Sequence, residues 1–578
     1  MAGPTAPKDP EKARPFFYIL KDKDIFGERQ KDGTGIQFIY ESDGRPINSA
    51  QITGNVTDKE ELRLLETVEG FGRLVHSIGV SVETDRPEET AEFVFQMYGK
   101  KDLYGGGTNL TTSLKCDGME HRIYLSDYRW TEDDHVPGQI KILFAAPERM
   151  GKVSVRLFLN DGYEAPPEEE DLVIDMHSEE YCGMISRSLL QLGNPYRIRK
   201  AIEKSKAGKE VTLAYIGGSI TQGAGAIPIH TECYAYKSFQ LFQNRFSTQN
   251  NVRFIKAGVG GTPSELGMIR FDRDVLREGE RPDIVVIEFA VNDEGDETKG
   301  VCYESLVRKV LKLPWKPAVV LLFSVFANDW NLQERLRPVG DLYDLPMVSI
   351  RDAVTPQFSL KCGEGRILSK NQFFYDIFHP NNTGHTIMAD CLQYLFERCD
   401  AAEPARVGTF VEGMTEEQIL SEKLSGPAVI GADFERIFLL DKKNRYVGAK
   451  IRAGSFTSTD MELQSVEMDG NLIQTPEFPY NWMYDGSRPQ MAGFEMEIIC
   501  KSLFLIFKDS GETDVGKANV FVNDVYCMTA DPHKNNWLHC NAVLLFWETE
   551  SRSHKVRIAV TEEDRNKKFT ILGFGYTI

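Results

Sequence analysis

Alternating hydrophobic and polar positions dominate the first third of the chain. Between about Gly35 and Met176, turn residues and charged loops separate short alternating segments, namely GIQFIYES, AEFVFQMY, HRIYLSDY, GQIKILFA and KVSVRLFL. A period of two is typical of strands with one buried face, and strands at this spacing are typical of an antiparallel β-sandwich. The pattern ends at PPEEEDLV, because two prolines followed by like charges break regular structure.

Continuous apolar runs replace this alternation between Val211 and Cys399. The runs alternate with segments of helical periodicity, and their sequences are VTLAYI, RFIKAGV, DIVVIEFAV, VVLLFSVF and MVSI. Strands that are apolar throughout are buried on both faces, as in a parallel sheet covered by helices. We therefore predict an α/β domain with a five-stranded parallel sheet and helices on both faces.

Alternation returns from about Thr409 to Ile578, in RIFLLDKK, AKIRAGSF, SLFLIFKD, ANVFVNDV, AVLLFWET, HKVRIAV and KFTILGFGY. This pattern predicts a second β-sandwich. A chain of 578 residues also exceeds the roughly 250–300 residues at which a single core stops growing. The predicted fold class is therefore multidomain α/β plus β. We expect an N-terminal β-sandwich with a disordered leader over residues 1–180, a central α/β domain over 181–402 and a C-terminal β-sandwich over 403–578.

The charge and the apolar content of the chain narrow its partners and its location. Lys and Arg total 67 against 86 Asp and Glu, and the resulting formal charge of -19 repels nucleic acids and anionic membrane surfaces. No apolar run approaches the roughly 20 residues of a membrane span. The first residues, MAGPTAPKDPEKARPFF, lack the apolar core of a secretory signal. We expect a cytoplasmic protein with no nucleic-acid or membrane partner.

Metal and cofactor motifs do not stand out. The 10 cysteines are scattered without a C-x-x-C pair, which argues against a zinc site. Neither an H-E-x-x-H sequence nor a phosphate-binding G-x-x-x-x-G-K-[ST] loop occurs. We predict no metal and no cofactor.

Reactive residue types follow the predicted parallel strands. Ligands of such sheets bind at the carboxyl ends of the strands, so the residues there are the ones to inspect. VTLAYI runs into Gly217-Gly218-Ser219, the second strand into a glycine-rich turn that includes Gly261, and the third into Asn292. Each motif alone is compatible with an ordinary turn or helix cap.

A fourth motif follows the last strand, in Asp376-Ile377-Phe378-His379-Pro380-Asn381-Asn382-Thr383-Gly384-His385. An aspartate three residues before a histidine can orient the imidazole by accepting its other ring hydrogen. The sequon at Asn381 would be a poor place for a glycan so near this histidine, which favours a bacterial cytosolic origin. We interpret His385 as a structural residue of the final helix.

In this order the motifs resemble the four blocks of the SGNH, or GDSL-like, hydrolase superfamily. The resemblance implies a serine esterase with Ser219, Asp376 and His379 as its triad. It also implies an oxyanion hole made by the backbone N–H groups of Ser219 and Gly261 and the side chain of Asn292. Two positions depart from the usual pattern, because Gly218 replaces the Asp of G-D-S and Ala290 replaces the Gly of G-x-N-D. Neither position supplies a catalytic atom.

The G-G-S-I-T block is similar to that of carbohydrate acetylesterases in the superfamily. This resemblance implies removal of O-acetyl groups from a plant-type polysaccharide or its oligosaccharides, with the β-sandwiches as accessory and carbohydrate-binding domains and a homo-oligomeric assembly. Aromatic rings stack on sugars, so Tyr480, Trp482, Tyr484 and Trp537 are candidate binding platforms. For each of them, packing in a core or loop is the alternative.

Two other functions stay open at the level of sequence. The first keeps the triad but acts as a lysophospholipase or thioesterase, although no amphipathic lid helix stands out. The second is an inactive sugar-binding protein, against which the presence of all five site residues argues.

Overall fold

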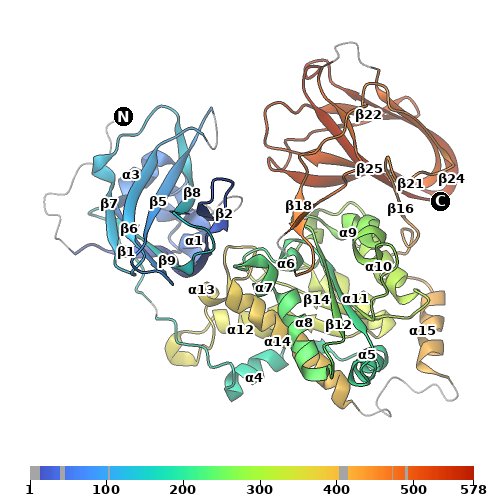
Figure 1. Cartoon of the computed structure of the whole chain (residues 1–578), viewed down its shortest axis with the longest axis horizontal. Coiled ribbons are helices and arrows are strands. Elements are labelled where there is room, and N and C mark those ends of the chain that lie inside the picture. The colour runs from blue at the N-terminus through green and yellow to red at the C-terminus, as the bar shows by residue number, and fades with distance from the viewer. Residues whose placement is uncertain are drawn as a thin grey trace.

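Three groups of sheets follow one another along the chain (Figure 1). The computed structural model describes residues 13–39, 46–101, 105–168, 170–402, 414–470, 473–487 and 492–578. Residues 1–12, where the predicted leader begins, and 403–413, where the third predicted domain begins, lie outside the described residues.

Two antiparallel sheets make up the N-terminal part, drawn in blue in Figure 1. One has four strands in the order β1 (Phe16–Phe26), β9 (Met150–Leu159), β4 (Val75–Thr84) and β7 (His121–Tyr124). The other has five, in the order β2 (Glu28–Arg29), β3 (Gly35–Ile39), β8 (Asp134–Phe144), β5 (Thr90–Gly99) and β6 (Asn109–Lys115). The connecting helices are α1 (Pro46–Ile52), α2 (Lys59–Leu64) and α3 (Val68–Leu74). Inward side chains of both sheets, such as Val155 and Phe93, belong to one hydrophobic cluster.

The central sheet has six strands and is mixed, so the prediction of five parallel strands is wrong in number. The order is β10 (Leu189–Gln191), β15 (Met347–Ser349), β14 (Ala318–Phe323), β13 (Ile284–Glu288), β11 (Val211–Gly217) and β12 (Val252–Gly258). The last five strands are parallel and correspond to the five predicted apolar runs. The additional edge strand β10 is antiparallel to β15.

Helices cover both faces of this sheet because side chains on its strands alternate between two cores. Leu213 and Tyr215 face one cluster, whereas Ala214 and Ile216 face the other. The first cluster holds residues of α4 (Glu179–Ser186), α5 (Tyr196–Lys206), α8 (Tyr234–Phe246), α12 (Ile350–Phe358), α13 (Lys370–Phe373) and α14 (Asn382–Ala401). The second holds residues of α9 (Ser264–Phe271), α10 (Val301–Leu311) and α11 (Gln333–Tyr343). The short helices α6 (Ser219–Gln222) and α7 (Ile229–Glu232) lie between β11 and α8.

Hydrogen bonds join eight strands of the C-terminal part into one sheet. Its main path is β16 (Phe438–Leu440), β25 (Phe569–Thr577), β21 (Phe494–Asp509), β24 (His539–Val560), β22 (Ala518–Val522) and β23 (Val525–Ala530), with β17 (Ala449–Arg452) on β21 and β20 (Trp482–Tyr484) on β25. A ribbon of β18 (Ser465–Glu467) and β19 (Gln474–Pro476) reaches toward the central sheet, and α15 (Glu416–Ser425) precedes these strands (Figure 1).

The C-terminal part shares a core with the central sheet. Phe504 and Ile506 of β21 and Leu572 of β25 belong to the same cluster as α9, α10 and α11. The N-terminal sheets, in contrast, form a cluster of their own. The central and C-terminal parts therefore share one cluster in addition to the clusters that each has without the other, whereas the N-terminal sheets have a separate one.

Candidate active site

Ser219 begins α6 directly after β11, at the carboxyl edge of the central sheet. Gly217 pairs in register with Gly258 of β12 and with Glu288 of β13, so the loops after all three strands meet at this edge. A Cβ atom on Gly218 would lie 2.3 Å from the Asn292 Oδ1 atom. Only glycine at position 218 therefore lets the Asn292 side chain lie this close to the serine turn.

The loop between α13 and α14 holds an acid and a base beside this serine. The His379 Nε2 atom is 2.9 Å from the Ser219 Oγ atom, and the His379 Nδ1 atom is 2.9 Å from Asp376 Oδ2. The other carboxylate oxygen, Asp376 Oδ1, accepts the backbone N–H groups of Phe378 at 2.7 Å and His379 at 2.8 Å. Since an ionised carboxylate only accepts hydrogen bonds, Nδ1 carries the imidazole proton and Nε2 is left to accept the serine hydroxyl.

Asp376 is buried, and burial alone would raise the pKa of its carboxyl. The charge of His379, its ring N–H and the two backbone N–H donors outweigh burial and lower the pKa of Asp376 below its usual value. The carboxyl is therefore ionised at neutral pH and can orient and stabilise an imidazolium. The structure thus brings the three predicted triad residues into one hydrogen-bonded chain.

A glycine turn after β12 lies next to the serine. Gly261 has a φ of 70°, in the left-handed region that favours glycine. The Gly260 N–H group donates to Gln222 Oε1 at 2.9 Å, and the Gly260 carbonyl accepts the Gln464 Nε2 amide at 2.9 Å. The Gly261 carbonyl accepts the His539 Nε2–H group at 3.0 Å. Two side chains of the C-terminal part thus bind both carbonyls and fix the turn. The Gly261 N–H group takes no part in these hydrogen bonds.

The donors predicted for an oxyanion hole therefore lie at one place in the structure. Asn292 follows β13, and its side chain lies against Gly218. Its Oδ1 atom is buried and makes no hydrogen bond among the described residues. Preorganised N–H donors of this kind stabilise the negative charge that develops on a carbonyl oxygen under attack.

A buried arginine, which the sequence patterns did not single out, supports the serine turn. The Arg270 guanidinium of α9 is fully buried and donates to the Gly217 carbonyl and to the Ala257 carbonyl, both at 2.7 Å. Its charge is balanced by Asp274, whose Oδ2 atom lies 3.0 Å from Arg270 Nη1. Arg270 thus ties together the ends of β11 and β12. Its only signal in the sequence is a charge within the apolar run SELGMIRF.

The sequence patterns also did not single out the buried carboxyl of Glu288. Glu288 ends β13, and its Oε2 atom accepts the Thr221 hydroxyl at 3.1 Å. Burial raises the pKa of Glu288 to about 7. The Thr221 hydroxyl also lies 2.8 Å from that of Tyr234, so α6 is anchored from below by a polar network. The signal in the sequence is the single charge inside DIVVIEFAV.

The four aromatic candidates differ in location. Trp482 and Tyr484 are 6% and 1% exposed and pack in the C-terminal core. Their burial agrees with the alternative of core packing, although Trp482 also lines a cavity of about 380 Å³ between strands of the C-terminal part. Tyr480 is 45% exposed and lies under the Lys443 ammonium group. Trp537 is 37% exposed, and its ring would be 2.8 Å from a Cβ atom on Gly261.

A cavity of about 570 Å³ opens beside the triad, and its lining comes from all three parts of the chain. His379 and Asp376 line it together with the segment 224–230. The N-terminal sheets contribute Phe26, Glu28, Arg29, Gln37, Phe38 and Glu148, and the β18–β19 ribbon contributes Glu467 and Gln474. Its volume is within the roughly 300–1,000 Å³ of sites for small ligands.

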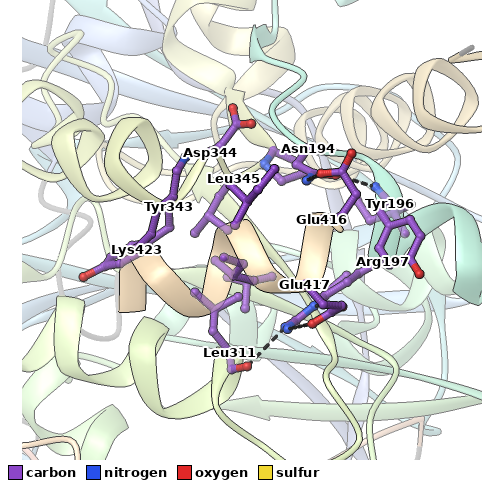
Figure 2. Close-up of a pocket in the computed structure, with 16 residues that line it drawn as sticks. Asn194, Tyr196, Arg197, Leu311, Tyr343, Asp344, Leu345, Glu416, Glu417 and Lys423 are labelled. Carbon is purple, nitrogen blue, oxygen red and sulfur yellow. Dashed lines mark hydrogen bonds and ion pairs between the residues drawn. The ribbon is translucent and has the colours of Figure 1, made fainter. Parts of the chain in front are cut away.

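A second cavity, of about 40 Å³, lies between α5 and α15 (Figure 2). In its lining, Arg197 pairs with Glu417 at 2.9 Å and also donates to the carbonyls of Leu311 and Pro317. Because it is too small for a substrate, we interpret this cavity as a seam between packed helices.

Within the described residues, no group of three or more His, Cys, Asp and Glu side chains could hold a metal ion. No helix in the same part of the chain is long and apolar enough to cross a bilayer. All 10 cysteines are free thiols.

Comparisons with known proteins agree with the fold of the central part. Residues 215–387 match the GDSL-like Lipase/Acylhydrolase family. A two-domain esterase (CEX) active on acetylated mannans is 23% identical, covers 68% of this chain and 98% of its own, and has a TM-score of 0.55. Its structure co-crystallized with mannopentaose is likewise 23% identical, with 68% and 97% covered and a TM-score of 0.54. A search of curated proteins gave no match.

These likenesses establish a fold with an SGNH-type domain and an additional β-rich domain. The resemblance to the SGNH hydrolases that the strand-end motifs predicted is thereby confirmed. About a third of this chain lies outside the match to the two-domain esterase.

Proposed function

We propose that this protein, whose central domain is a GDSL-like lipase/acylhydrolase domain, is a serine esterase that removes acetyl groups from the hydroxyls of acetylated oligosaccharides or polysaccharides. The observation that carries the proposal is the continuous contact from Asp376 through His379 to Ser219, beside a turn of backbone donors. This is the geometry that acyl transfer by a serine requires.

In the proposed mechanism, the Ser219 Oγ atom attacks the ester carbonyl while His379 Nε2 takes the hydroxyl proton. The N–H groups of Ser219 and Gly261 and the Asn292 amide bind the resulting oxyanion. When the carbonyl re-forms, the C–O bond to the sugar breaks and His379 gives its proton to the departing sugar oxygen. Water then attacks the acyl-enzyme by the same route and releases acetate and free Ser219.

The size of the acyl group is inferred from the surroundings of the glycine turn. The Trp537 ring and the His539 imidazole both lie within contact distance of Gly261 and fill the space on that side of the oxyanion donors. A short acyl group fits such a site better than a long chain. p-Nitrophenyl acetate is expected to be a better substrate than p-nitrophenyl octanoate, and the opposite order would favour a lysophospholipase or thioesterase.

The nature of the alcohol is inferred from the cavity and from the fold. Polar side chains and aromatic rings line the space beyond His379, as sites for sugars require. The esterase whose fold the chain shares is active on acetylated mannans, which makes acetylated mannose units the first substrates to try.

The test incubates the wild type, Ser219→Ala and Ser421→Ala with acetylated manno- and xylo-oligosaccharides and follows loss of acetyl units by mass spectrometry. Ser421 is an exposed serine of α15 and serves as the control. The expected result is acetate release by the wild type and the control but not by Ser219→Ala. Activity that survives in Ser219→Ala would disprove the site and the mechanism together.

A further inference from the structure

The N-terminal part of the chain takes no part in the proposed chemistry, yet it forms one wall of the active-site cavity. Phe26 lies at the end of β1, Arg29 is in β2 and Phe38 is in β3, and all three line the cavity that also contains His379. Facing them are the segment 224–230 and the β18–β19 ribbon.

Hydrogen bonds join this wall to the segment that leads into the loop with Asp376 and His379. The Lys23 ammonium group of β1 is buried and donates to the backbone carbonyls of Asn371, at 3.2 Å, and Phe374. The Asn371 side chain in turn lies 3.2 Å from the Thr53 hydroxyl and 3.4 Å from the Lys21 carbonyl. Since these contacts end two residues before Asp376, the wall and the triad hold a defined distance from each other.

Hydrogen bonds from one side chain fix the backbone of this wall at its two phenylalanines. The Gln37 side chain accepts the backbone N–H of Phe26 at 2.9 Å and donates to the backbone carbonyl of Phe38 at 2.7 Å. Both phenylalanine rings are half-buried, so each keeps a face toward the cavity. Beside them Arg29 and Glu148, 3.1 Å apart, are largely exposed and can exchange their ion pair for hydrogen bonds to a ligand.

The opposite wall combines the aliphatic residues of the segment 224–229 with hydrogen-bonding groups from His230, Gln222 and the β18–β19 ribbon. Glu467 accepts the amides of Gln222 at 3.3 Å and Gln474 at 3.1 Å, which orients the three side chains as a polar strip. The Nδ1 atom of His230, also in the lining, makes no hydrogen bond among the described residues. A pyranose unit has apolar C–H faces and a polar edge of hydroxyl groups. The aromatic rings suit its faces, and the hydrogen-bonding groups suit its edge.

We propose that Phe26 and Phe38 form a subsite for the sugar units that flank the acetylated residue, so that the N-terminal part selects oligosaccharide chains over isolated acetyl esters. This inference rests on the proposed esterase function. The cavity of about 570 Å³ is several times larger than an acetyl group needs, and these rings form part of its lining. The subsite makes kcat/KM depend on the length of the sugar chain, because each stacked ring contributes binding energy that a small ester cannot use.

The test compares Phe26→Ala, Phe38→Ala and the double variant with Phe16→Ala. Phe16 is the matched control, because it is also a half-buried ring of β1 but lies at the opposite end of the strand, against Tyr18 and Phe158. Each protein is assayed with an acetylated mannopentaose and with p-nitrophenyl acetate. An aromatic contact is worth about 0.5–1.5 kcal/mol, so each subsite variant is expected to lower the ratio of kcat/KM for the pentaose to that for the small ester roughly 2- to 10-fold, through KM.

Phe16→Ala is expected to keep the wild-type ratio, and its thermal stability shows how much the loss of one ring from β1 costs. Equal ratios in all four variants would overturn the subsite while leaving the esterase intact. Failure of the proposed function looks different, because then Ser219→Ala would hydrolyse p-nitrophenyl acetate as fast as the wild type.

Discussion

Asn292 is the proposed oxyanion donor whose side chain can be removed without touching the backbone. We expect Asn292→Ala to lower kcat for p-nitrophenyl acetate by about 10²–10³, because the lost donor acts mainly on the transition state. KM is expected to change little. Steady-state kinetics on the purified variant test this, together with a melting curve. A kcat close to that of the wild type would show that the amide takes no part in binding the oxyanion.

His385 makes a prediction about stability and pH. It is fully buried on α14, accepts the Tyr234 N–H at its Nδ1 atom and donates from Nε2 to the Ala224 carbonyl, both at 3.1 Å. Burial lowers the pKa of His385 from 6.5 to about 3. The unfolded chain therefore takes up this proton first, so the stability that the neutral ring contributes is complete above pH ~6.5 and is lost progressively as the pH falls toward ~3.

Between pH ~6.5 and ~5 the loss amounts to about 2 kcal/mol, at 1.36 kcal/mol per pH unit. We expect His385→Gln, which keeps an acceptor and a donor but cannot titrate, to lose stability more slowly over this range than the wild type. Urea unfolding at several pH values measures the two slopes. His76, whose pKa burial lowers to about 4, adds the same pH dependence to both proteins and cancels in the comparison. Parallel slopes would contradict the assignment.

Most of the individual site residues could be predicted from the sequence, because each reactive residue belongs to a local motif. Ser219 and Asn292 follow their strands within a few residues, and the parallel sheet brings strand ends together. His379 lies in the loop before α14 and was marked by its spacing from Asp376. Gln464 and His539 could not be predicted in this way. They reach the glycine turn from more than 200 residues further along the chain, and nothing local marks them.

Among the elements, β1 connects the N-terminal sheets to the triad loop through Lys23. We expect Lys23→Met to lower kcat for p-nitrophenyl acetate by about 10-fold or more with a smaller change in KM, because two loop carbonyls lose their donor and the loop can shift. Lys21→Met is the control, since the Lys21 ammonium pairs with Glu168, 3.3 Å away.

The two lysine variants are compared by kinetics and by thermal melting. A purely structural role for Lys23 would lower the melting temperature while leaving kcat of the folded enzyme at the wild-type value. Recovery of kcat in Lys23→Arg, which restores donors to the carbonyls, would support positioning of the loop.

At the level of elements, pattern and structure differ where an element is short or where burial depends on a partner. β10 has three residues, LLQ, too few to show a period, so the sixth strand of the central sheet was missed. Trp482 and Tyr484 belong to a strand whose rings point into the C-terminal core, and the sequence PYNWMYDG does not reveal that orientation. Four of the five apolar runs, by contrast, form strands of five to seven residues, and the fifth, β15, is as short as β10 but is apolar in the sequence MVSI.

In the whole molecule, the distribution of cores predicts how it unfolds. The central and C-terminal parts share one cluster, and the buried Glu477 binds Arg273 across their boundary. The N-terminal sheets have a cluster of their own. We therefore expect calorimetry to show two transitions, a larger one for the central and C-terminal parts together and a smaller one for the N-terminal part.

Hydrogen exchange followed by mass spectrometry assigns each transition to its residues. Separate melting of the C-terminal strands while the central sheet remains folded would contradict a shared core. A Glu477→Ala variant should weaken the coupling of these two parts and leave the smaller transition at its original temperature, because Glu477 lies outside the N-terminal cluster.

The composite lining of the active-site cavity also has a consequence for protein synthesis. Chains fold as they emerge from the ribosome, N-terminal part first. Ser219, Asp376 and His379 are all made before the ribosome reaches Gln464, Glu467 and His539, which hold the glycine turn and close the cavity. A nascent or prematurely terminated chain can therefore assemble the three reactive side chains while lacking the fixed oxyanion turn, and esterase activity should first appear only once the last strands are translated.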